Sequence, residues 1–378
     1  DALRFEAAGM IAYGARCNFG DHLHPLGEMD MTTYRNIGVA YEYVERIEEY
    51  GIGGLPAATL GFWPSYQLEA DEGLARMLLE TQLDFDVALP GDDLSRFDAI
   101  VVPSHAGVLE GSEQQLASYL EQGGSLLVLG HGALKEDGSL VDLPFGAELS
   151  GEPQFDMDYT LVDGGELSLP GSGPADELPG TPFLNYRAAL RFSLESGVKQ
   201  LASIQEPWFS RTYGHYCGHQ NTPNKPEAVG PAAWQTGRVV VLAHDLDRIY
   251  YVNGAKVHRD LFQAALRRLP LAPMAEAALP SAGRLSLLHQ EREKRYVAHL
   301  LYGPPIERGR CVVIEDLPEL HNVAVTLRLP YEPKSLRLEP SGQSLEYEGS
   351  WTDGSRRRFE VKTTVPAFSC HTAIVADY

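Results

Sequence analysis

Apolar residues follow two different periods along the chain. In segments 2–14 and 32–50 they recur every three or four positions, as expected for helices with one buried face. Between these segments, residues 15–19 are predicted to form a short strand that ends at Gly20 and leads into a polar loop. This order of helix, strand and helix predicts one αβα unit, which cannot bury its apolar faces alone.

The middle of the chain alternates predicted strands with predicted helices. Strands are expected at 60–63, 85–89, 97–102, 125–129 and 239–243, and helices at 72–82, 113–122 and 260–268. Short apolar strands that alternate with helices are typical of a parallel sheet covered on both faces. The pattern therefore predicts a doubly wound, flavodoxin-like domain of the α/β class, and residues 135–235 read as an elaboration of it.

Strands alone are predicted beyond the Ala- and Pro-rich segment 270–280. Seven are expected, at 285–289, 296–302, 310–315, 323–327, 335–339, 359–364 and 372–376. Their short, regular spacing with Pro and Gly turns predicts an antiparallel β-sandwich. We therefore expect three domains, at residues 1–54, 55–270 and 281–378.

Composition narrows the class of ligand. The chain has 52 acidic and 31 basic residues, a formal net charge of −21, which disfavours phosphate backbones, so we expect no nucleic-acid partner. No apolar run is long enough to span a membrane, and we expect no membrane partner. The four cysteines lack a paired spacing, which favours a reducing compartment and a cytoplasmic location. A neutral small molecule is the ligand that this composition best permits.

The first candidate site follows the strand predicted at 15–19. It consists of Asp21, His22 and His24, and residues two apart in an extended segment share a face. One interpretation is contact with sugar hydroxyls, or acid/base chemistry, because strand ends carry the sites of parallel α/β proteins. The alternative is an ordinary surface loop.

The second candidate site is the polar and aromatic segment 209–223. Tyr213, His215, His219 and Asn221 combine rings with groups that hydrogen-bond in both directions, which suits carbohydrates. Cys217 lies between the two histidines, but no further ligand pair completes a zinc site, so we expect no metal. A structural role for the histidines stays open.

The predicted doubly wound domain lacks a nucleophile. The turn after strand 125–129 reads Gly130-His131-Gly132, without Cys or Ser. Ser104-His105 is weak evidence for a triad, and Asp245 and Asp247 read as turn residues after a strand. Its glycines do not form the Gly-x-Gly-x-x-Gly pattern of dinucleotide sites, so no cofactor is expected.

Three motifs and the terminal sandwich resemble a known family. Residues 97–132 (FDAIVVPSHAGVLEGSEQQLASYLEQGGSLLVLGHG) resemble the trimerisation domain of trimeric β-galactosidases, an amidotransferase-like fold without the nucleophile. Residues 14–25 resemble the last βα unit of the catalytic TIM barrel in relatives that include bacterial α-L-fucosidases. Residues 211–223 and the terminal sandwich resemble parts of the same group.

The resemblance implies the C-terminal portion of a retaining exo-glycosidase that hydrolyses terminal sugars, with the end of a (β/α)8 barrel at the start of the chain. It favours an α-L-fucosidase over a β-galactosidase, and a non-catalytic assembly or carbohydrate-binding module remains an alternative. The catalytic carboxylates are expected outside this segment. A glycoside substrate and a homo-oligomer, trimer or hexamer, are the implied partners.

Overall fold

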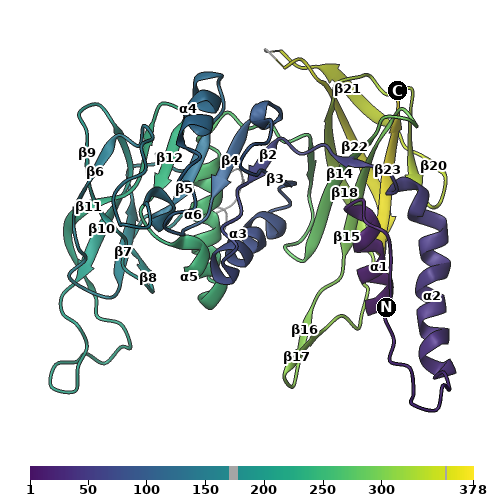
Figure 1. The fold of residues 1–378 in the computed structure, drawn as a ribbon, viewed down its shortest axis with the longest axis horizontal. Helices are drawn as coiled ribbons and strands as arrows, with labels where there is room; N and C mark the ends of the chain where they lie inside the picture. Colours follow the sequence, from purple (N-terminus) through teal and green to yellow (C-terminus); the bar gives the residue numbers. More distant parts are fainter. Residues whose placement is uncertain (170–177, 354–355) are drawn as a thin grey trace. The chain divides into compact units, whose positions relative to one another are not determined.

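The chain forms two compact units in the computed structural model, which describes residues 1–169, 178–353 and 356–378. The first unit comprises Asp1–Ala58, Leu78–Phe85 and Pro273–Tyr378, and the second comprises Thr59–Met77 and Asp86–Ala272. Each unit contains both helices and sheets (Figure 1). The prediction of a mixed α/β chain that includes a β-sandwich is confirmed.

Two antiparallel sheets form the sandwich of the first unit. One has the order β1 (Leu55–Pro56), β14 (Gly283–Gln290), β15 (Arg295–Tyr302), β23 (Cys370–Asp377), β19 (Ser335–Glu339) and β20 (Gln343–Ser344). The other has the order β13 (Ala275–Ala277), β18 (Leu320–Leu329), β22 (Phe359–Phe368) and β21 (Tyr347–Trp351). A separate hairpin pairs β16 (Ile306–Arg308) with β17 (Cys311–Val313). Each of the seven predicted strands overlaps one of these strands.

Alternation of apolar and polar residues places the core of the sandwich. In β22, Val361 and Val365 are buried against residues of the opposite sheet such as Ile374, while Lys362 and Thr364 face outward. Successive side chains of a strand point to opposite faces, so this period of two buries one face only. The pattern that predicted the strands is thus the pattern that fills the core.

Two helices of the first unit lie on the six-stranded sheet (Figure 1). They are α1 (Ala2–Ala12) and α2 (Met31–Ile47), and η1 (Glu48–Tyr50) continues α2. Ile11 of α1 and Val44 of α2 share an apolar cluster with Leu301 of β15. The side chain of Asp30 caps α2 by accepting the backbone N–H groups of Thr32 and Thr33. Both predicted helices of this region are therefore present.

The strand predicted at residues 15–19 is wrong. These residues are irregular, because a strand requires a hydrogen-bonded neighbour and the described part of the chain provides none there. The side chain of Phe19 instead packs edge-on against Tyr41 of α2, with ring centroids 5.5 Å apart. The apolar residues that suggested a strand pack on a helix. Whether residues 1–54 complete a barrel stays a prediction.

A nine-stranded sheet is the centre of the second unit. Its order is β3 (Asp86–Val87), β2 (Leu60–Phe62), β4 (Ala99–Val102), β5 (Leu126–Leu129), β12 (Val239–Leu242), β11 (Asn224–Thr236), β10 (Lys199–Pro207), β7 (Asp158–Val162) and β8 (Phe183–Asn185). The strands from β3 to β12 run parallel, and those from β12 to β8 pair antiparallel. Because β4, β5 and β12 are parallel neighbours, the residues that follow them meet at one edge.

The remaining elements surround this sheet or form separate pairs. The helical elements are α3 (Leu68–Glu80), η2 (Leu94–Arg96), α4 (Glu113–Glu121), η3 (Gly130–Ala133), α5 (Leu246–Asn253) and α6 (Lys256–Leu266). A short pair joins β6 (Ala147–Gly151) and β9 (Arg191–Leu194). The predicted parallel strands and their helices overlap these elements, whereas the long β10 and β11 were not predicted. In the described ranges, no helix is long and apolar enough to cross a membrane.

Candidate functional site

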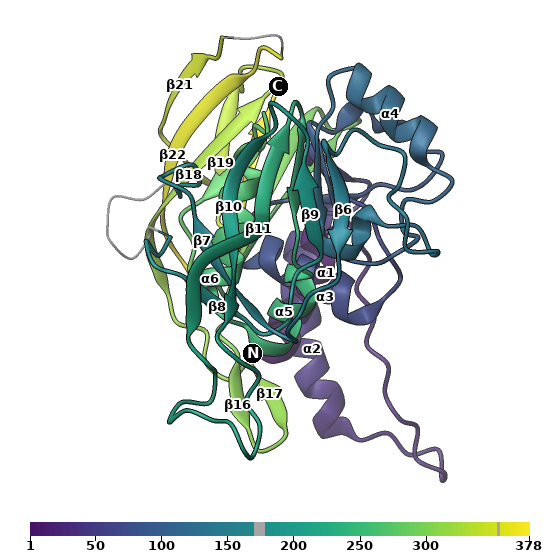
Figure 2. The same ribbon diagram turned by 90° about the vertical axis from the view of Figure 1, so that its left-hand side faces the viewer.

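The second candidate site forms one loop at the end of a hairpin. Strands β10 and β11 pair antiparallel, and residues 208–223 connect them (Figure 2). We call these residues the hairpin loop. Tyr213, His215, His219 and Asn221 all lie in it, so the structure brings this predicted set together. Whether the set binds substrate stays a prediction.

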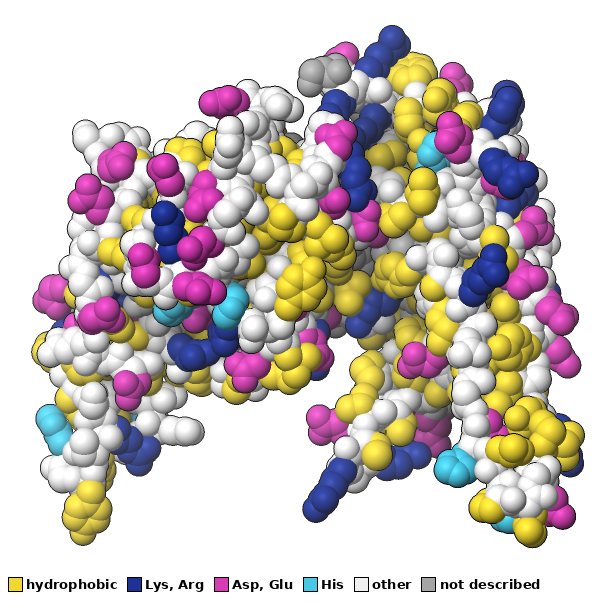
Figure 3. Space-filling view, in the orientation of Figure 1, with side chains coloured by type: hydrophobic (Ala, Val, Ile, Leu, Met, Phe, Trp, Pro, Cys, Tyr) yellow, Lys and Arg dark blue, Asp and Glu magenta, His cyan; other side chains and the backbone are white. Residues whose placement is uncertain are grey.

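Most side chains of the hairpin loop are exposed. Tyr213 is fully exposed, Tyr216 is 70% exposed and Trp208 is 58% exposed. Figure 3 shows hydrophobic, histidine and basic side chains gathered on this loop, at the lower left of the view. Arg211, Thr212, Tyr213 and Tyr216 line a shallow hollow on it. Exposed rings beside imidazole and guanidinium groups are free to meet another molecule.

Contacts within the hairpin loop give it a defined shape. The rings of Phe209 and His215 stack with centroids 3.8 Å apart. The backbone N–H of Thr212 donates to the carbonyl of His215 at 2.8 Å, and Arg211 donates to the carbonyl of Gln220 at 3.2 Å. At the base, the Tyr159 hydroxyl donates to the carbonyl of buried Thr222 at 2.6 Å. The backbone that carries the two histidines is therefore held by contacts within the loop and at its base.

Cys217 does not gather metal ligands. Its thiol lies 3.4 Å from the carbonyl oxygen of His219 and 3.8 Å from that of Asn221, as a donor to backbone oxygens. Among the described residues, no group of three or more His, Cys, Asp or Glu side chains could hold a metal ion.

The first candidate site lies in the loop between α1 and α2 of the first unit. Asp21, His22 and His24 are exposed there. Asp21 accepts the backbone N–H of His22 at 2.8 Å, and His24 Nδ1 accepts that of Leu26 at 3.3 Å. Both contacts are local, so these groups retain most of their hydrogen-bonding capacity. This set and the hairpin loop belong to different compact units.

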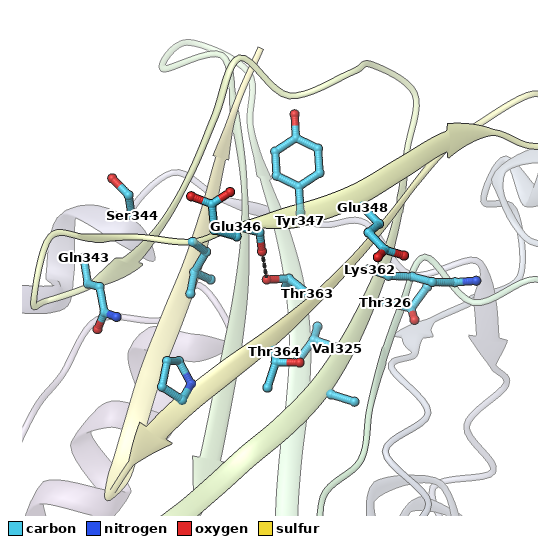
Figure 4. A pocket seen from close by; sticks show the side chains of 13 residues that line it. Val325, Thr326, Gln343, Ser344, Glu346, Tyr347, Glu348, Lys362, Thr363 and Thr364 are labelled. Atoms are coloured by element: carbon cyan, nitrogen blue, oxygen red, sulfur yellow. Dashed lines mark hydrogen bonds between the residues drawn. The ribbon is translucent and has the colours of Figure 1, made fainter.

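A hollow on the sandwich is less suited to a sugar. It lies over β18, β20, β21 and β22 and is lined largely by polar side chains such as Thr326, Glu348 and Lys362 (Figure 4). Its aromatic residue, Tyr347, points away from the other labelled side chains, and its hydroxyl donates to the carbonyl of Pro333 at 3.1 Å. No ring face is presented for a pyranose to stack on.

Two pairs of polar residues, Ser104 with Asp247 and His131 with Asp245, meet at the carboxyl edge of β4, β5 and β12, although Asp245 and Asp247 read as turn residues in the sequence. The backbone N–H of Ser104 donates to Asp247 at 2.7 Å, and its hydroxyl donates to the same carboxylate. Burial raises the pKa of Asp247 to about 7, although these donors oppose the shift. His131 Nδ1 lies 2.8 Å from Asp245 Oδ1. The signal in the sequence was that Ser104, His131 and Asp245 each come shortly after a parallel strand, with Asp247 in the first turn of the helix that follows β12.

A second polar group lies deeper and was missed. Asp158 of β7 is fully buried, with Arg191 Nη1 at 3.0 Å and His244 Nε2 at 2.7 Å. Burial raises the pKa of Asp158, but the charge and hydrogen bond of His244, the backbone N–H of Ala189 and the charge of Arg191 together outweigh it, and the net pKa is lowered. Arg191 also donates to Glu206 at 3.2 Å. Because these groups satisfy one another, the cluster is structural.

Comparisons with known proteins give a structural relationship. No protein-family model and no curated protein matches the chain. Among solved structures, the α-L-fucosidase isoenzyme 2 from Paenibacillus thiaminolyticus is similar over 100% of this chain, with 30% identity and a TM-score of 0.89. The predicted resemblance is confirmed. This chain has the fold of a portion of a glycoside hydrolase of the α-L-fucosidase and β-galactosidase type.

Two β-galactosidases share the fold at lower similarity. That from Bacillus circulans sp. alkalophilus is similar over 99% of this chain, with 10% identity and a TM-score of 0.59. That from Rahnella sp. R3 is also similar over 99%, with 14% identity and a TM-score of 0.57. The chain spans 57% of the fucosidase and 51% of each β-galactosidase.

Proposed function

We propose that this chain is part of a retaining exo-glycosidase, specifically an α-L-fucosidase, and that it supplies assembly and substrate-contact residues. The supporting observation is the contrast between 30% identity with the fucosidase and 10% with the Bacillus β-galactosidase, each over essentially the whole chain. The catalytic carboxylates belong to a barrel that is largely outside residues 1–378, and residues 1–54 adjoin its end without the strand predicted at 15–19.

The second unit is the assembly domain of this proposal. Its parallel strands β3, β2, β4, β5 and β12 support a flavodoxin-like, amidotransferase-like core. The turn after β5 is Gly130-His131-Gly132, so the nucleophile of that class is missing. A domain of this kind serves association into a homo-oligomer, a trimer or hexamer, in place of catalysis.

The hairpin loop is the substrate-contact element of this proposal. Its tyrosine rings and imidazoles are exposed. Side chains of these kinds bind sugars, because the rings stack on a sugar ring and the imidazoles hydrogen-bond its hydroxyls. Association of subunits would bring the loop of one subunit to the barrel of its neighbour. His215 and His219 would then contact the glycoside, and Asp21, His22 and His24 would do so from the barrel end.

Assay of the protein that contains this chain tests the activity. Nitrophenyl α-L-fucoside and nitrophenyl β-D-galactoside are compared at equal concentration. We expect turnover of the fucoside, with retention of the anomeric configuration followed by NMR. Turnover of the galactoside alone would replace the proposal with a β-galactosidase, and hydrolysis of neither would favour a non-catalytic module.

Variants of the hairpin loop test its role. We expect His215→Ala and His219→Ala each to raise KM or lower kcat/KM about tenfold, the loss of one or two hydrogen bonds to substrate. His321→Ala, an exposed histidine of the sandwich, is the control and should leave both constants unchanged. Unchanged kinetics in both loop variants would make the loop purely structural.

A further inference from the structure

A chain of hydrogen bonds joins α2 to the six-stranded sheet of the first unit through two buried histidines. The Tyr43 hydroxyl of α2 lies 2.9 Å from His371 Nδ1 of β23, and His371 Nε2 lies 3.0 Å from His299 Nδ1 of β15. His299 Nε2 lies 3.2 Å from the carbonyl oxygen of Tyr50 in η1. His299 is 0% exposed and His371 is 4% exposed. The chain of bonds therefore begins and ends on the helical segment and passes through the sheet.

The partners in this chain of bonds fix the protons on both imidazoles. A carbonyl oxygen only accepts, so His299 Nε2 carries a proton and Nδ1 of the neutral ring does not. His371 Nε2 then donates to His299, and His371 Nδ1 accepts from the Tyr43 hydroxyl. A proton added at His299 Nδ1 would set two N–H groups against each other. One added at His371 Nδ1 would turn the Tyr43 hydroxyl to the carbonyl oxygen of His371, 3.0 Å away, and leave a buried positive charge.

Cationic side chains lie against both tyrosines of this chain of bonds. The guanidinium groups of Arg4 in α1 and Arg46 in α2 lie 5.8 and 5.9 Å from the centroid of the Tyr43 ring. That of Arg295 in β15 lies 4.9 Å from the centroid of the Tyr50 ring. An imidazolium between the tyrosines would add a further positive charge beside these three.

Glu339 and Cys370 also lie next to the chain of bonds, without supplying a counter-charge to the imidazoles. Burial, and then the charge of Glu339 in β19, raise the pKa of Tyr50 to about 12, so this carboxylate acts on a tyrosine hydroxyl. Burial raises the pKa of the Cys370 thiol in β23, which keeps it neutral. Burial lowers the pKa of His299 to about 4, and burial with the charge of His299 lowers that of His371. Both imidazoles are therefore neutral at pH 7.

The carbonyl groups at the end of the helical segment are held separately. Gln290 Nε2 donates to the carbonyl oxygens of Glu49 and Ile52 at 2.9 and 2.8 Å, and Arg295 Nη2 donates to that of Glu49 at 2.8 Å. Both donor side chains are buried, an amide does not titrate, and a guanidinium keeps its proton in proteins. Residues 49–52 are therefore fixed to the sheet independently of the histidines.

Few side chains hold the rest of α2. Ala40, Val44 and Ile47 are its buried residues, and residues 31–39 are exposed or half-buried. The strands β15 and β23, which carry the two histidines, are paired with each other along the whole of β15. Loss of the chain of hydrogen bonds therefore weakens the attachment of the helix more than it weakens the sheet.

We propose that Tyr43, His299, His371 and the Tyr50 carbonyl form an acid-sensitive latch, the histidine latch, which holds α2 against the sheet at neutral pH and releases it in mild acid. A proton that enters the pair favours the released helix, because the imidazolium then reaches water. The helix turns about residues 49–52, which their separate hydrogen bonds keep in place. The sandwich remains folded.

Release of α2 would also move the loop that carries Asp21, His22 and His24. This consequence, an activity that falls reversibly in mild acid, rests on the proposed glycosidase function. The histidine latch itself is measured on the helix without substrate. Failure of either proposal therefore leaves the other in place.

Hydrogen–deuterium exchange of the protein that contains this chain, at pH 7 and pH 5, tests the histidine latch. Each rate is divided by that of an unstructured peptide at the same pH. The released His299 binds its proton near the ordinary pKa of 6.5, and the closed one near 4, so acid favours release between these values. Protection of amides 40–47 should therefore fall about twentyfold between pH 7 and pH 5, and it should recover on return to pH 7.

The sandwich core is the internal reference. Because β22 lies between two other strands of its sheet, its amides open only when the first unit unfolds. Amides 40–47 should exchange faster than those of β22 at both pH values. Equal protection of the two would mean that α2 leaves only with global unfolding, and this would overturn the latch. A corrected exchange rate of amides 40–47 that does not change with pH would overturn it too.

Two tyrosine variants distinguish the histidine latch from a general weakening of α2. Tyr43→Phe deletes the hydroxyl at His371 and keeps the ring, so protection of amides 40–47 at pH 7 should fall about fivefold, the loss of one hydrogen bond. Tyr41→Phe is the matched control, since the Tyr41 hydroxyl donates to the carbonyl of Cys17 at 3.4 Å. A bond of that length is weak, and its loss should cost less than about twofold. Equal effects of the two variants would contradict the proposal.

A double variant tests the histidines themselves. His299→Gln combined with His371→Gln keeps side chains that form hydrogen bonds but do not titrate, so the fall in protection between pH 7 and pH 5 should disappear. A folded double variant that retains this fall would rule the latch out. If the double variant does not fold, the comparison of Tyr43→Phe with Tyr41→Phe decides, because both leave the histidines in place.

Discussion

The hairpin loop and the carboxyl edge of the parallel strands contain similar residue types in opposite environments. In the loop, His215 and His219 are exposed and contact mainly their own segment. Beside the sheet edge, His244 is buried and its Nε2 bonds Asp158 of β7, and at the edge Asp247 is fully buried and bonded by Ser104. Residue type alone therefore does not distinguish a contact surface from a structural cluster. The burial of the side chains and the identity of their hydrogen-bond partners make this distinction.

Removal of the Asp158 carboxylate should have the largest effect on the free energy of unfolding. Asp158→Ala leaves Arg191 and His244 buried without their carboxylate, so we expect about 3–5 kcal/mol loss in the free energy of unfolding. Urea denaturation measures the loss. Asp156→Ala is the control, because Asp156 is exposed only two residues away. A loss below about 1 kcal/mol for Asp158→Ala would mean that the cluster is not structural.

Acidification should lower the stability of the fold through its buried histidines and not through its exposed ones. His299 Nδ1 lies 3.0 Å from His371 Nε2 inside the first unit, and burial lowers the pKa of His299 to about 4. Burial, and then the charge of His299, lower the pKa of His371 as well. Since the unfolded chain binds more protons between pH 6.5 and 4, stability falls as pH is lowered through this window, by about 3 kcal/mol for His299.

Urea denaturation at pH 7 and pH 4.5 tests this dependence. His299→Gln should be less stable at pH 7 but should lose less stability on acidification than the unchanged chain. His321→Gln, at an exposed position of the sandwich, should leave the pH dependence as it is. An unchanged slope in His299→Gln would contradict the assignment.

Removal of one donor at the sheet edge should have an intermediate effect. Ser104→Ala deletes the hydroxyl that donates to buried Asp247, which should cost about 1–2 kcal/mol of unfolding free energy. The carboxyl of Asp247 should then titrate at a still higher pH, because a donor to its charged form is lost. Thermal denaturation and carboxyl NMR measure the two effects. If Ser104→Ala leaves the free energy of unfolding unchanged, the backbone N–H donors alone are enough to hold the Asp247 carboxylate.

The smallest effect on stability is expected in the hairpin loop. Tyr213→Ala removes a fully exposed ring, so the free energy of unfolding should change by less than about 0.5 kcal/mol. Urea denaturation of the isolated chain measures it. A larger loss would place Tyr213 in a packed environment and would weaken the contrast from which the substrate-contact proposal starts.

Much of the fold followed from local patterns. The run Phe359 to Thr364 alternates apolar and polar residues, and only one register buries Val361 while exposing Lys362. The apolar runs of β4, β5 and β12 likewise required burial on both faces. By contrast, residues 15–19 had strand-like composition, but no strand in the described part of the chain pairs with them. Phe19 packed on Tyr41, a contact that no local pattern could reveal.

The sequence by itself determined which segments must be buried, because hydrophobic period and turn residues act over a few positions. It also placed Tyr213, His215, His219 and Asn221 in one loop, since they lie within nine consecutive positions. Only the tertiary structure decided the fate of Ser104, His131, Asp245 and Asp247. They are separated by more than a hundred residues at the widest, and they meet because β4, β5 and β12 are parallel neighbours that end at one edge.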